Sequence, residues 1–325
     1  MKRRTVIAGL PFLLAGHPLA ARAQPQARVV ALWPFGENDA EGQALSAGFN
    51  AALLDRGQRE VLIQHRWGGA DGARTRALAV EAIRSQPQVI FTYLNAQLRA
   101  VTALSHTIPL VFVGASDPAG FGLIENLSRP GGHVTGFTLY ESSLGGKWLA
   151  ALQEAVPAIK WATLLLTPSA ATRDGHLYAE AFLGTAAALS IEPAVVMADK
   201  AADIDPIVAD LAQCGNAGLI VAPGTLSEAQ GDRIVAMTAA ARIPTLFAIR
   251  RFARRGGLMS YGPNPDELVR RAAVYVDRIL RGADPGSLPI QAPTKYDLII
   301  NLNAARSLGY DISSALLAQA DEVVE

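Results

Sequence analysis

Polar and aromatic side chains follow several apolar segments of the sequence, at the points where predicted strands end. The carboxyl ends of parallel strands meet at one edge of a sheet, and small molecules bind in the crevice outside that edge. Polar groups there would fix the orientation of a ligand, and aromatic rings would cover its apolar part. We therefore predict a ligand site made of Phe35, Thr92, Tyr93, Asn95, Ser116, Asp117, Tyr140, Ser169, Thr225 and Arg250.

Each of these residues also has a purely structural interpretation. Asn95 and Asp117 are residue types that commonly cap helices, and the ring of Tyr93 suits a protein core. The sequence leaves open which members contact a ligand, and whether Arg250 faces the site or solvent.

Known signatures of catalysis and of metal binding are missing from the sequence. The four histidines that follow His17 are scattered, and no His-x-x-x-His or Cys-x-x-Cys spacing would hold a metal ion. The Gly120–Gly122 turn lacks the third glycine of a dinucleotide fingerprint, because Glu125 stands there. Ser46 lies inside a predicted helix, whereas a nucleophile elbow needs its serine on a strand-to-helix turn. We predict no catalytic residue, no metal and no cofactor.

The elements that would position the predicted site are short apolar strands alternating with amphipathic helices. In the first half they are expected at 29–33, 40–56, 61–63, 72–84, 89–92 and 110–113. Continuous apolar strands are typical of a parallel sheet covered on both faces, joined by right-handed crossovers. The pattern predicts a doubly wound α/β sheet.

The same alternation restarts after a break near Thr138–Ser142. Its expected elements lie at 143–156, 162–166, 175–189, 193–197, 204–213, 218–222, 227–241 and 245–247. A strand at 258–261, a helix at 265–281, a strand at 296–300, a helix at 301–309 and a short tail follow. These late elements are too few for a third domain, so we expect them to return and complete both halves.

The fold class predicted from this organisation is α/β, with two doubly wound parallel-sheet lobes and a ligand cleft between them. We expect the first lobe to comprise residues 24–138 and about 263–292. The second lobe would comprise residues 139–262 and about 293–325.

The first 23 residues read as an export signal and not as part of the fold. Lys2, Arg3 and Arg4 form a basic region, an apolar stretch spans 6–19, and Ala21-Arg22-Ala23 is a small-x-small cleavage site. The whole chain carries 29 basic and 29 acidic residues. Loss of the signal would leave 25 basic against 29 acidic residues, a formal charge of −4. We expect a mature protein in the periplasm.

Composition and cysteine content further limit the kinds of protein that this sequence could encode. Half of the 325 residues are hydrophobic, which is ample for packed cores. A neutral charge balance argues against nucleic-acid binding, and no apolar run after the N-terminus is long enough to span a membrane. Cys214 has no partner, so no disulfide forms within the chain, and we expect it as a packed thiol at a helix end.

An ordered series of short motifs resembles one known family. The series consists of 109–113, Asp117-Pro118, 122–124, 129–136, 256–262, 275–282, Leu288-Pro289, 293–296 and 300–302. Together these motifs resemble the ABC-transporter substrate-binding proteins of the tryptophan/tyrosine-binding type. The resemblance spans essentially the whole mature chain. It departs from the family pattern at His133, at the bulky turn Thr92–Asn95 and at Arg254-Arg255.

The resemblance implies a periplasmic-binding-protein fold of type I-like topology, with three interlobe crossings. It also implies a non-enzymatic role: capture of a small organic solute, an amino acid or a related compound, by hinge closure. Delivery would be to an ABC permease and its ATPase, with only peripheral contact with the membrane. Two alternatives remain, a ligand-sensing protein that serves a membrane receptor and a secreted α/β enzyme.

Overall fold

The structure is a computed structural model that describes residues 27–58, 61–69, 71–115, 118, 122–139, 141–166 and 173–325. For residues 173–177 and for Thr225 the description covers the backbone alone. The predicted export signal, residues 1–23, lies outside the described residues. Among the helices of the described part, none combines the length and apolar character that crossing a membrane requires.

Within the described residues, the strands form two separate sheets. The first has the order β2-β1-β3-β4-β5 with all its pairs parallel. Its strands are β1 (Arg28–Trp33), β2 (Leu62–Trp67), β3 (Val89–Tyr93), β4 (Leu110–Ala115) and β5 (Val134–Thr138). The second has the order β12-β11-β10-β9-β8-β6-β7. Its strands are β6 (Trp161–Leu166), β7 (Glu192–Met197), β8 (Ala217–Val221), β9 (Thr245–Phe247), β10 (Met259–Pro263), β11 (Tyr296–Asn301) and β12 (Glu322–Val324).

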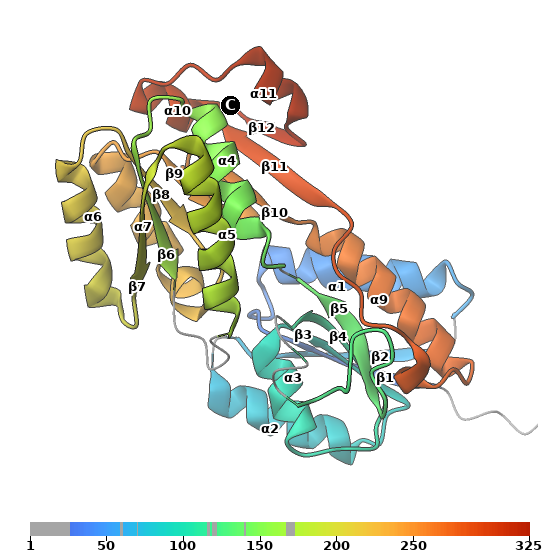
Figure 1. Cartoon of the computed structure of the whole chain (residues 1–325). Helices are drawn as coiled ribbons and strands as arrows, with labels where there is room; N and C mark the ends of the chain where they lie inside the picture. The colour runs from blue at the N-terminus through green and yellow to red at the C-terminus, as the bar shows by residue number, and fades with distance from the viewer. Residues whose placement is uncertain are drawn as a thin grey trace, which may run out of the picture.

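Helices cover both faces of the first sheet, as Figure 1 shows. One face packs against α1 (Ala40–Leu54) and α9 (Pro265–Leu280), and the other packs against α2 (Gly72–Arg84) and α3 (Asn95–Thr102). Residues Val29, Ala31 and Trp33 of β1 face α1 and α9, whereas Val30 and Leu32 face α2 and α3. Strand side chains alternate between the faces, so a strand buried on both sides must be apolar throughout.

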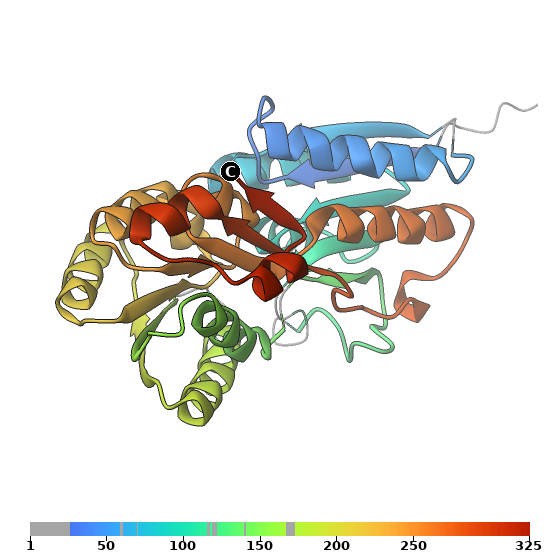
Figure 2. The ribbon, with the colours of Figure 1, turned by 90° about the horizontal axis from the view of Figure 1, so that it is seen from above.

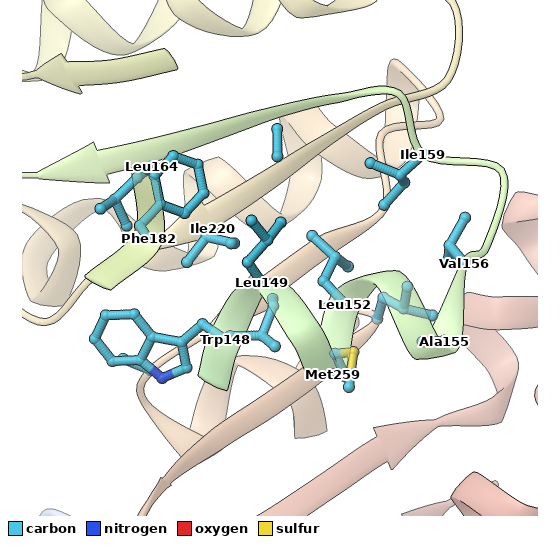
Figure 3. Packing of buried hydrophobic residues seen from close by; sticks show 14 of the residues in the cluster. Trp148, Leu149, Leu152, Ala155, Val156, Ile159, Leu164, Phe182, Ile220 and Met259 are labelled. Atoms are coloured by element: carbon cyan, nitrogen blue, oxygen red, sulfur yellow. The ribbon is translucent and has the colours of Figure 1, made fainter. Parts of the chain in front are cut away.

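The second sheet is enclosed in the same way, and its core is largest under α4 (Leu144–Ala155). Leu144, Trp148, Leu152 and Ala155 recur every three or four residues and therefore lie on one helix face. Figure 3 shows this face packed against Leu164, Phe182 and other buried side chains. The remaining helical elements of this half are α5 (Arg173–Leu189), η1 (Ala201–Asp203), α6 (Ile204–Gln213), α7 (Thr225–Ala240), α8 (Arg250–Arg254), α10 (Leu302–Leu308) and α11 (Ser314–Gln319).

The C-terminal part of the chain crosses from the second sheet back to the first and then to the second again. The chain leaves the first sheet after β5, comes back at Asn264 to form α9, and leaves again beyond Gln291 to form β11. The short helix η2 (Pro285–Ser287) and a bridge between Phe137 and Gln291 hold this returning stretch on β5. Figure 2 shows α9 lying beside α1, from the opposite end of the sequence, on the first lobe. We call the two sheets with their helices the first and second lobes.

The structure corrects several of the expected elements. β2 extends to Trp67, and β5 and α8 are additional elements. The expected tail instead forms α11 and β12, and β12 pairs with β11. The second sheet is mixed, because β10 and β11 run antiparallel. Such short or edge elements carry little periodicity of their own and are specified by what they pack against.

The expectation of a packed thiol at Cys214 was wrong. Cys214 does follow the last residue of α6, as predicted, but its side chain is exposed. The buried face of α6 is formed by Ile204, Val208 and Leu211. Cys214 has left the helix in an extended conformation, so it no longer shares that face.

Candidate functional site

The first lobe carries an aromatic surface where β1 and β3 end. The ring centres of Phe35 and Tyr93 lie 5.8 Å apart, and those of Trp33 and Tyr93 also lie 5.8 Å apart. Tyr93 is nearly buried, whereas Phe35 is half-buried and so presents part of its ring. Phe35 packs on the backbone at Gly42, where an added Cβ would lie 2.7 Å from the Cβ of Phe35. The absence of a side chain at Gly42 thus lets Phe35 lie against the first turn of α1.

The turn between β3 and α3 has a strained backbone. Leu94 has φ 68° and ψ 168°, a conformation that residues other than glycine rarely adopt. Its side chain lies over Gly114, where an added Cβ would approach Leu94 Cδ2 to 2.7 Å. Asn95 follows directly and begins α3. Strain of this kind concentrates at binding and catalytic sites, which makes this bulky turn a candidate ligand contact.

Thr92 has a different environment from its neighbour Tyr93. Its side chain is fully buried within the sheet. Among the described residues, its Oγ1 has no hydrogen-bond partner. Thr92 therefore supports the turn from beneath and does not reach the surface that Phe35 presents.

The second lobe contributes two adjacent arginines at the start of α8, directly beyond β9. Arg250 is largely buried, with 17% of its side chain exposed, and Arg251 has 23% exposed. The next residue, Phe252, packs into the space above Gly231 of α7 and anchors this short helix. The guanidinium of Arg251 also lies over the ring of Phe252, at 4.5 Å from its centre.

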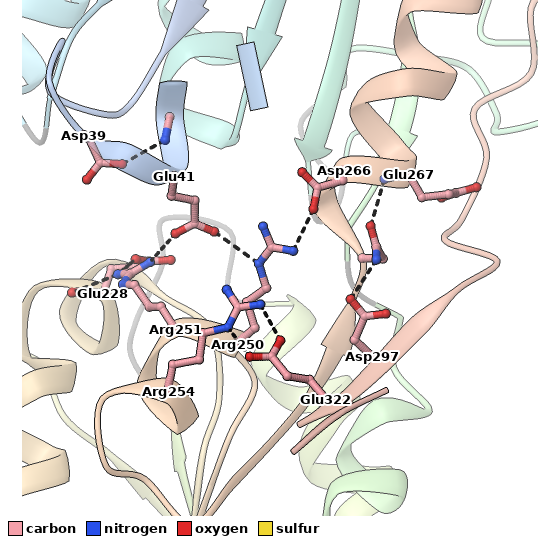
Figure 4. Close-up of polar contacts among 12 residues, drawn as sticks. Asp39, Glu41, Glu228, Arg250, Arg251, Arg254, Asp266, Glu267, Asp297 and Glu322 are labelled. Atoms are coloured by element: carbon pink, nitrogen blue, oxygen red, sulfur yellow. Dashed lines mark hydrogen bonds and ion pairs between the residues drawn. The ribbon is translucent and has the colours of Figure 1, made fainter. Parts of the chain in front are cut away.

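Carboxylates from both lobes meet these arginines, as Figure 4 shows. Arg250 Nη1 donates to Asp266 Oδ2 at 2.8 Å, and its Nε lies 3.6 Å from Glu41 Oε1. Arg251 Nη2 donates to Glu228, and its Nη1 lies 3.9 Å from Glu41 Oε2. Glu41 and Asp266 belong to the first lobe, because α1 and α9 pack on the first sheet. We call Glu41, Glu228, Arg250, Arg251 and Asp266 the interlobe cluster.

The electrostatics connect the aromatic surface with the interlobe cluster. Burial raises the pKa of Tyr93, and the nearby charges of Glu41 and Glu228 raise it further. Burial likewise raises the pKa of Glu228, and Glu41 adds to this rise, while Arg251 opposes it. Tyr93 therefore lies within the field of charges contributed by both lobes.

The structure thus brings Phe35, Tyr93 and Arg250 into one region and places Asn95 on the adjoining turn. Ser116, Asp117, Tyr140 and Ser169 lie outside the described residues. Thr225 begins α7, but its side chain is not described. In the described part of the chain, no group of three or more side chains suited to metal binding occurs.

Sequence reasoning missed four members of the interlobe cluster: Glu41, Glu228, Arg251 and Asp266. The sequence does contain a feature that they share, because each of these residues lies near the start of a helix that follows a strand. Glu41 comes two residues after Asp39, whose Oδ1 accepts from Gly42 N and caps α1. Charged residues near helix starts are so commonly solvated that their position alone did not distinguish them.

Two concavities are found in the described part of the molecule. A groove of about 750 Å³ runs between the C-terminal part of α1 and α9, and reaches Asp266 and Lys295. A smaller one of about 220 Å³ lies in the second lobe, between α7 and α10. Of the predicted ligand-site residues whose side chains the structure describes, none lines either concavity.

Comparison with known proteins places the chain in a family. Residues 30–324 match the family model described as ABC transporter substrate binding protein. A curated relative, the tyrosine-binding protein of Clostridioides difficile (strain R20291), is 21% identical over 272 residues, covering 82% of this chain and 77% of the relative.

Solved structures share the fold over most of the chain. A conserved domain protein from Vibrio cholerae superposes with a TM-score of 0.78 at 24% identity, covering 92% of this chain and 99% of that one. An ABC domain from Streptococcus pneumonia in complex with L-Trp gives 0.81 at 17% identity, covering 92% and 100%. A ligand-free, open substrate-binding protein with adhesive properties from Clostridium difficile gives 0.73 at 19% identity, covering 92% and 99%.

These similarities confirm the two-lobed α/β fold and the family expected from the sequence motifs. The family is one of binding proteins and not of catalysts, which agrees with the expected lack of enzymatic activity. The chain belongs to the family of ABC transporter substrate-binding proteins.

Proposed function

We propose that the chain is the periplasmic solute-binding component of an ABC importer. It captures a small organic solute between its two lobes by hinge closure and delivers it to the permease and its ATPase. The family membership supports this proposal. The chain also crosses between the lobes in a few short segments, and each lobe could move as a body about these segments.

The observation that carries the proposal is the meeting of unlike groups from two lobes. Phe35 and Tyr93 from the first lobe share one electrostatic environment with Arg250 from the second. A ligand that touched both sets would bind more tightly when the lobes are close. Differential affinity of this kind is what shifts a protein towards its closed form.

The ligand class is an amino acid or a closely related compound. The aromatic rings of Phe35 and Tyr93 offer a surface to an apolar or aromatic side chain. Backbone N–H groups at the start of α3, beside Asn95, suit a ligand carboxylate, and Asp117 would bind an ammonium group. The names of two relatives, a tyrosine-binding protein and a domain in complex with L-Trp, point in the same direction.

The remaining predicted residues complete this site in our proposal. Ser116 and Tyr140 would contribute from the first lobe and the first crossing, and Ser169 and Thr225 from the second lobe. Thr92 would act from beneath the turn, because its side chain is fully buried.

Calorimetric titration of the mature protein against the common amino acids tests the ligand class. We expect at least one amino acid to bind and to raise the melting temperature by mass action. The variant Phe35→Ala should weaken that binding, whereas Trp161→Ala, which removes a half-exposed ring from the far end of β6, should not. Stabilisation by sugars or metal ions but by no amino acid would refute the proposed class.

Asp117→Ala tests the ammonium contact separately. It should abolish binding of the amino acid while leaving the response to the corresponding deaminated acid. Equal loss of both responses would contradict the assigned role of Asp117.

Export and delivery need tests of their own. N-terminal sequencing of protein recovered from the periplasm should begin near Gln24. In vesicles that contain the cognate permease and ATPase, the loaded protein should stimulate ATP hydrolysis and uptake of the solute. Stimulation of a membrane receptor instead, with no uptake, would assign the protein to ligand sensing.

A further inference from the structure

Glu41 faces two arginines of the opposite lobe without completing a hydrogen bond to either. Its Oε1 lies 3.6 Å from Arg250 Nε, and its Oε2 lies 3.9 Å from Arg251 Nη1. Hydrogen bonds between a guanidinium and a carboxylate are shorter, about 2.7–2.9 Å. Both gaps would therefore close if the lobes approached by about an ångström.

One nitrogen of each arginine already has a carboxylate partner. Arg250 Nη1 donates to Asp266, and Arg251 Nη2 donates to Glu228. On the side that faces Glu41, Arg250 Nε is buried and has no hydrogen-bond partner among the described residues. A buried donor that has lost its water and gained no partner is costly, so bonding to Glu41 would be favourable.

Each partner is held firmly on its own lobe. Glu41 is in the first turn of α1, whose start is capped by Asp39 at 2.8 Å from Gly42 N. The arginines are on α8, which is anchored by buried Phe252. Figure 4 shows Glu41 and Asp266 on either side of Arg250, and Asp266 lies next to the crossing at Asn264. Glu41 therefore engages or releases the second lobe as the lobes move.

We propose that Glu41, Arg250 and Arg251 form an ion-pair latch that closes across the boundary between the lobes. The latch stabilises the closed form whether or not a ligand is present, and Glu41 acts on ligand binding through closure, without contact with the ligand. Glu41 is thus a positioning residue. Only the effect on ligand affinity rests on the proposed function; the effect on lobe closure does not.

The latch predicts that closure depends on ionic strength. The distance over which salt screens a charge falls from about 10 Å at 0.1 M salt to about 3 Å at 1 M. The latch charges are open to this screening, because they are partly exposed, with 24% of the Glu41 side chain accessible. The ratio of closed to open protein should fall as salt is raised. Loss of the latch should lower this ratio at low salt by roughly threefold to tenfold, the value of one or two ion pairs.

Distance measurement between two spin labels on the ligand-free full mature chain tests the proposal. One label is attached to the native Cys214 of the second lobe, and the other to Arg76→Cys on the exposed face of α2. In the otherwise unchanged protein, the closed population should be largest at low salt. Glu41→Gln, which keeps the shape and removes the charge, should reduce that population and weaken its salt dependence, while the Arg250–Asp266 pair, which also joins the lobes, retains a part of it.

Two variants serve as matched controls. Glu37→Gln removes an exposed carboxylate from the loop before α1. Arg255→Gln breaks an ion pair with Asp232 that lies wholly within the second lobe, at 2.7 Å. Both should leave the distance distribution and its salt dependence unchanged.

Arg251→Gln and the double variant complete a thermodynamic cycle. If the latch exists, the double variant should be no more open than Glu41→Gln alone, because the two groups act on each other. Once ligands are known, Glu41→Gln should lower the affinity by the same factor for every ligand that binds only to the closed form. Equal closed populations for Glu41→Gln and the unchanged protein at all salt concentrations would overturn the latch, and would leave the proposed ligand binding untouched.

Discussion

The first lobe brings aromatic rings to the lobe boundary, whereas the second brings a pair of arginines. Phe35 and Tyr93 are held by packing within their own lobe, against Trp33 and the backbone at Gly42. Arg250 is held in part by carboxylates of the opposite lobe, Glu41 and Asp266. The aromatic surface is therefore complete before the lobes meet, while the charged surface depends on their approach. We infer that the ligand binds first to the first lobe and that the second lobe then closes on it.

Disrupting the packing beneath α8 should have the largest effect on stability. Gly231→Ala would place a Cβ 2.0 Å from the ring of Phe252, which is buried and cannot swing into solvent. Overpacking of this kind costs about 1–3 kcal/mol. Chemical denaturation should show the loss. Gly184→Ala, at an exposed position of α5 with no neighbour within 4 Å, should leave stability unchanged or slightly higher. An unaffected Gly231→Ala variant would show that α8 is not anchored through Phe252.

Removing the exposed ring of the aromatic surface should weaken ligand binding next most strongly. Phe35→Ala is expected to raise the Kd about tenfold, because it removes a face that would pack on the ligand. Titration against the amino acid found to bind measures this change, and the melting temperature of the free protein should fall only slightly. Unchanged affinity would place the ligand away from the aromatic surface.

A smaller change should follow from moving Phe35 without removing it. Gly42→Ala would put a Cβ 2.7 Å from the Cβ of Phe35 and push the ring outward. Because the contact is with the Cβ of Phe35, whose position the backbone sets, the segment that carries Phe35 must shift, and stability should fall by about 1 kcal/mol. Affinity for the ligand should fall severalfold. Gly48→Ala in the same helix has no neighbour within 4 Å and should leave affinity unchanged.

The smallest expected effect is a pH dependence that comes from the charged surface. Burial raises the pKa of Glu228 in the folded protein above its unfolded value. The folded state then holds this proton to higher pH than the unfolded state does. The associated stability is fully present below the unfolded pKa, about 4.3, and is lost as pH rises through the raised folded pKa.

Melting temperatures between pH 4 and pH 7 test this pH dependence. Relative to the unchanged protein, Glu228→Gln should gain stability as pH rises, and by a small amount because 38% of the side chain is exposed. Glu37→Gln is the control at an exposed site. A difference between Glu228→Gln and the unchanged protein that does not vary with pH would contradict the assignment.

The sequence predicted the parts of this molecule that depend on local patterns. Periodicity located most strands and helices, and the strand ends indicated Phe35, Tyr93 and Asn95 as neighbours. It failed for short elements such as α8 and β12, which have too few residues for a period to show. It also failed for the tail, which is ordered by pairing with β11.

By itself, the sequence determined the α/β alternation, the family and the edge at which polar and aromatic groups gather. These properties arise from the spacing of apolar residues and from motifs within short stretches of chain. Only the tertiary structure decided that Arg250 and Arg251 face Glu41, and that Asp266 joins them through the return of α9 to the first lobe. The reason is physical: a charged side chain near a helix start has water as its default partner, and only the approach of another lobe supplies a different one.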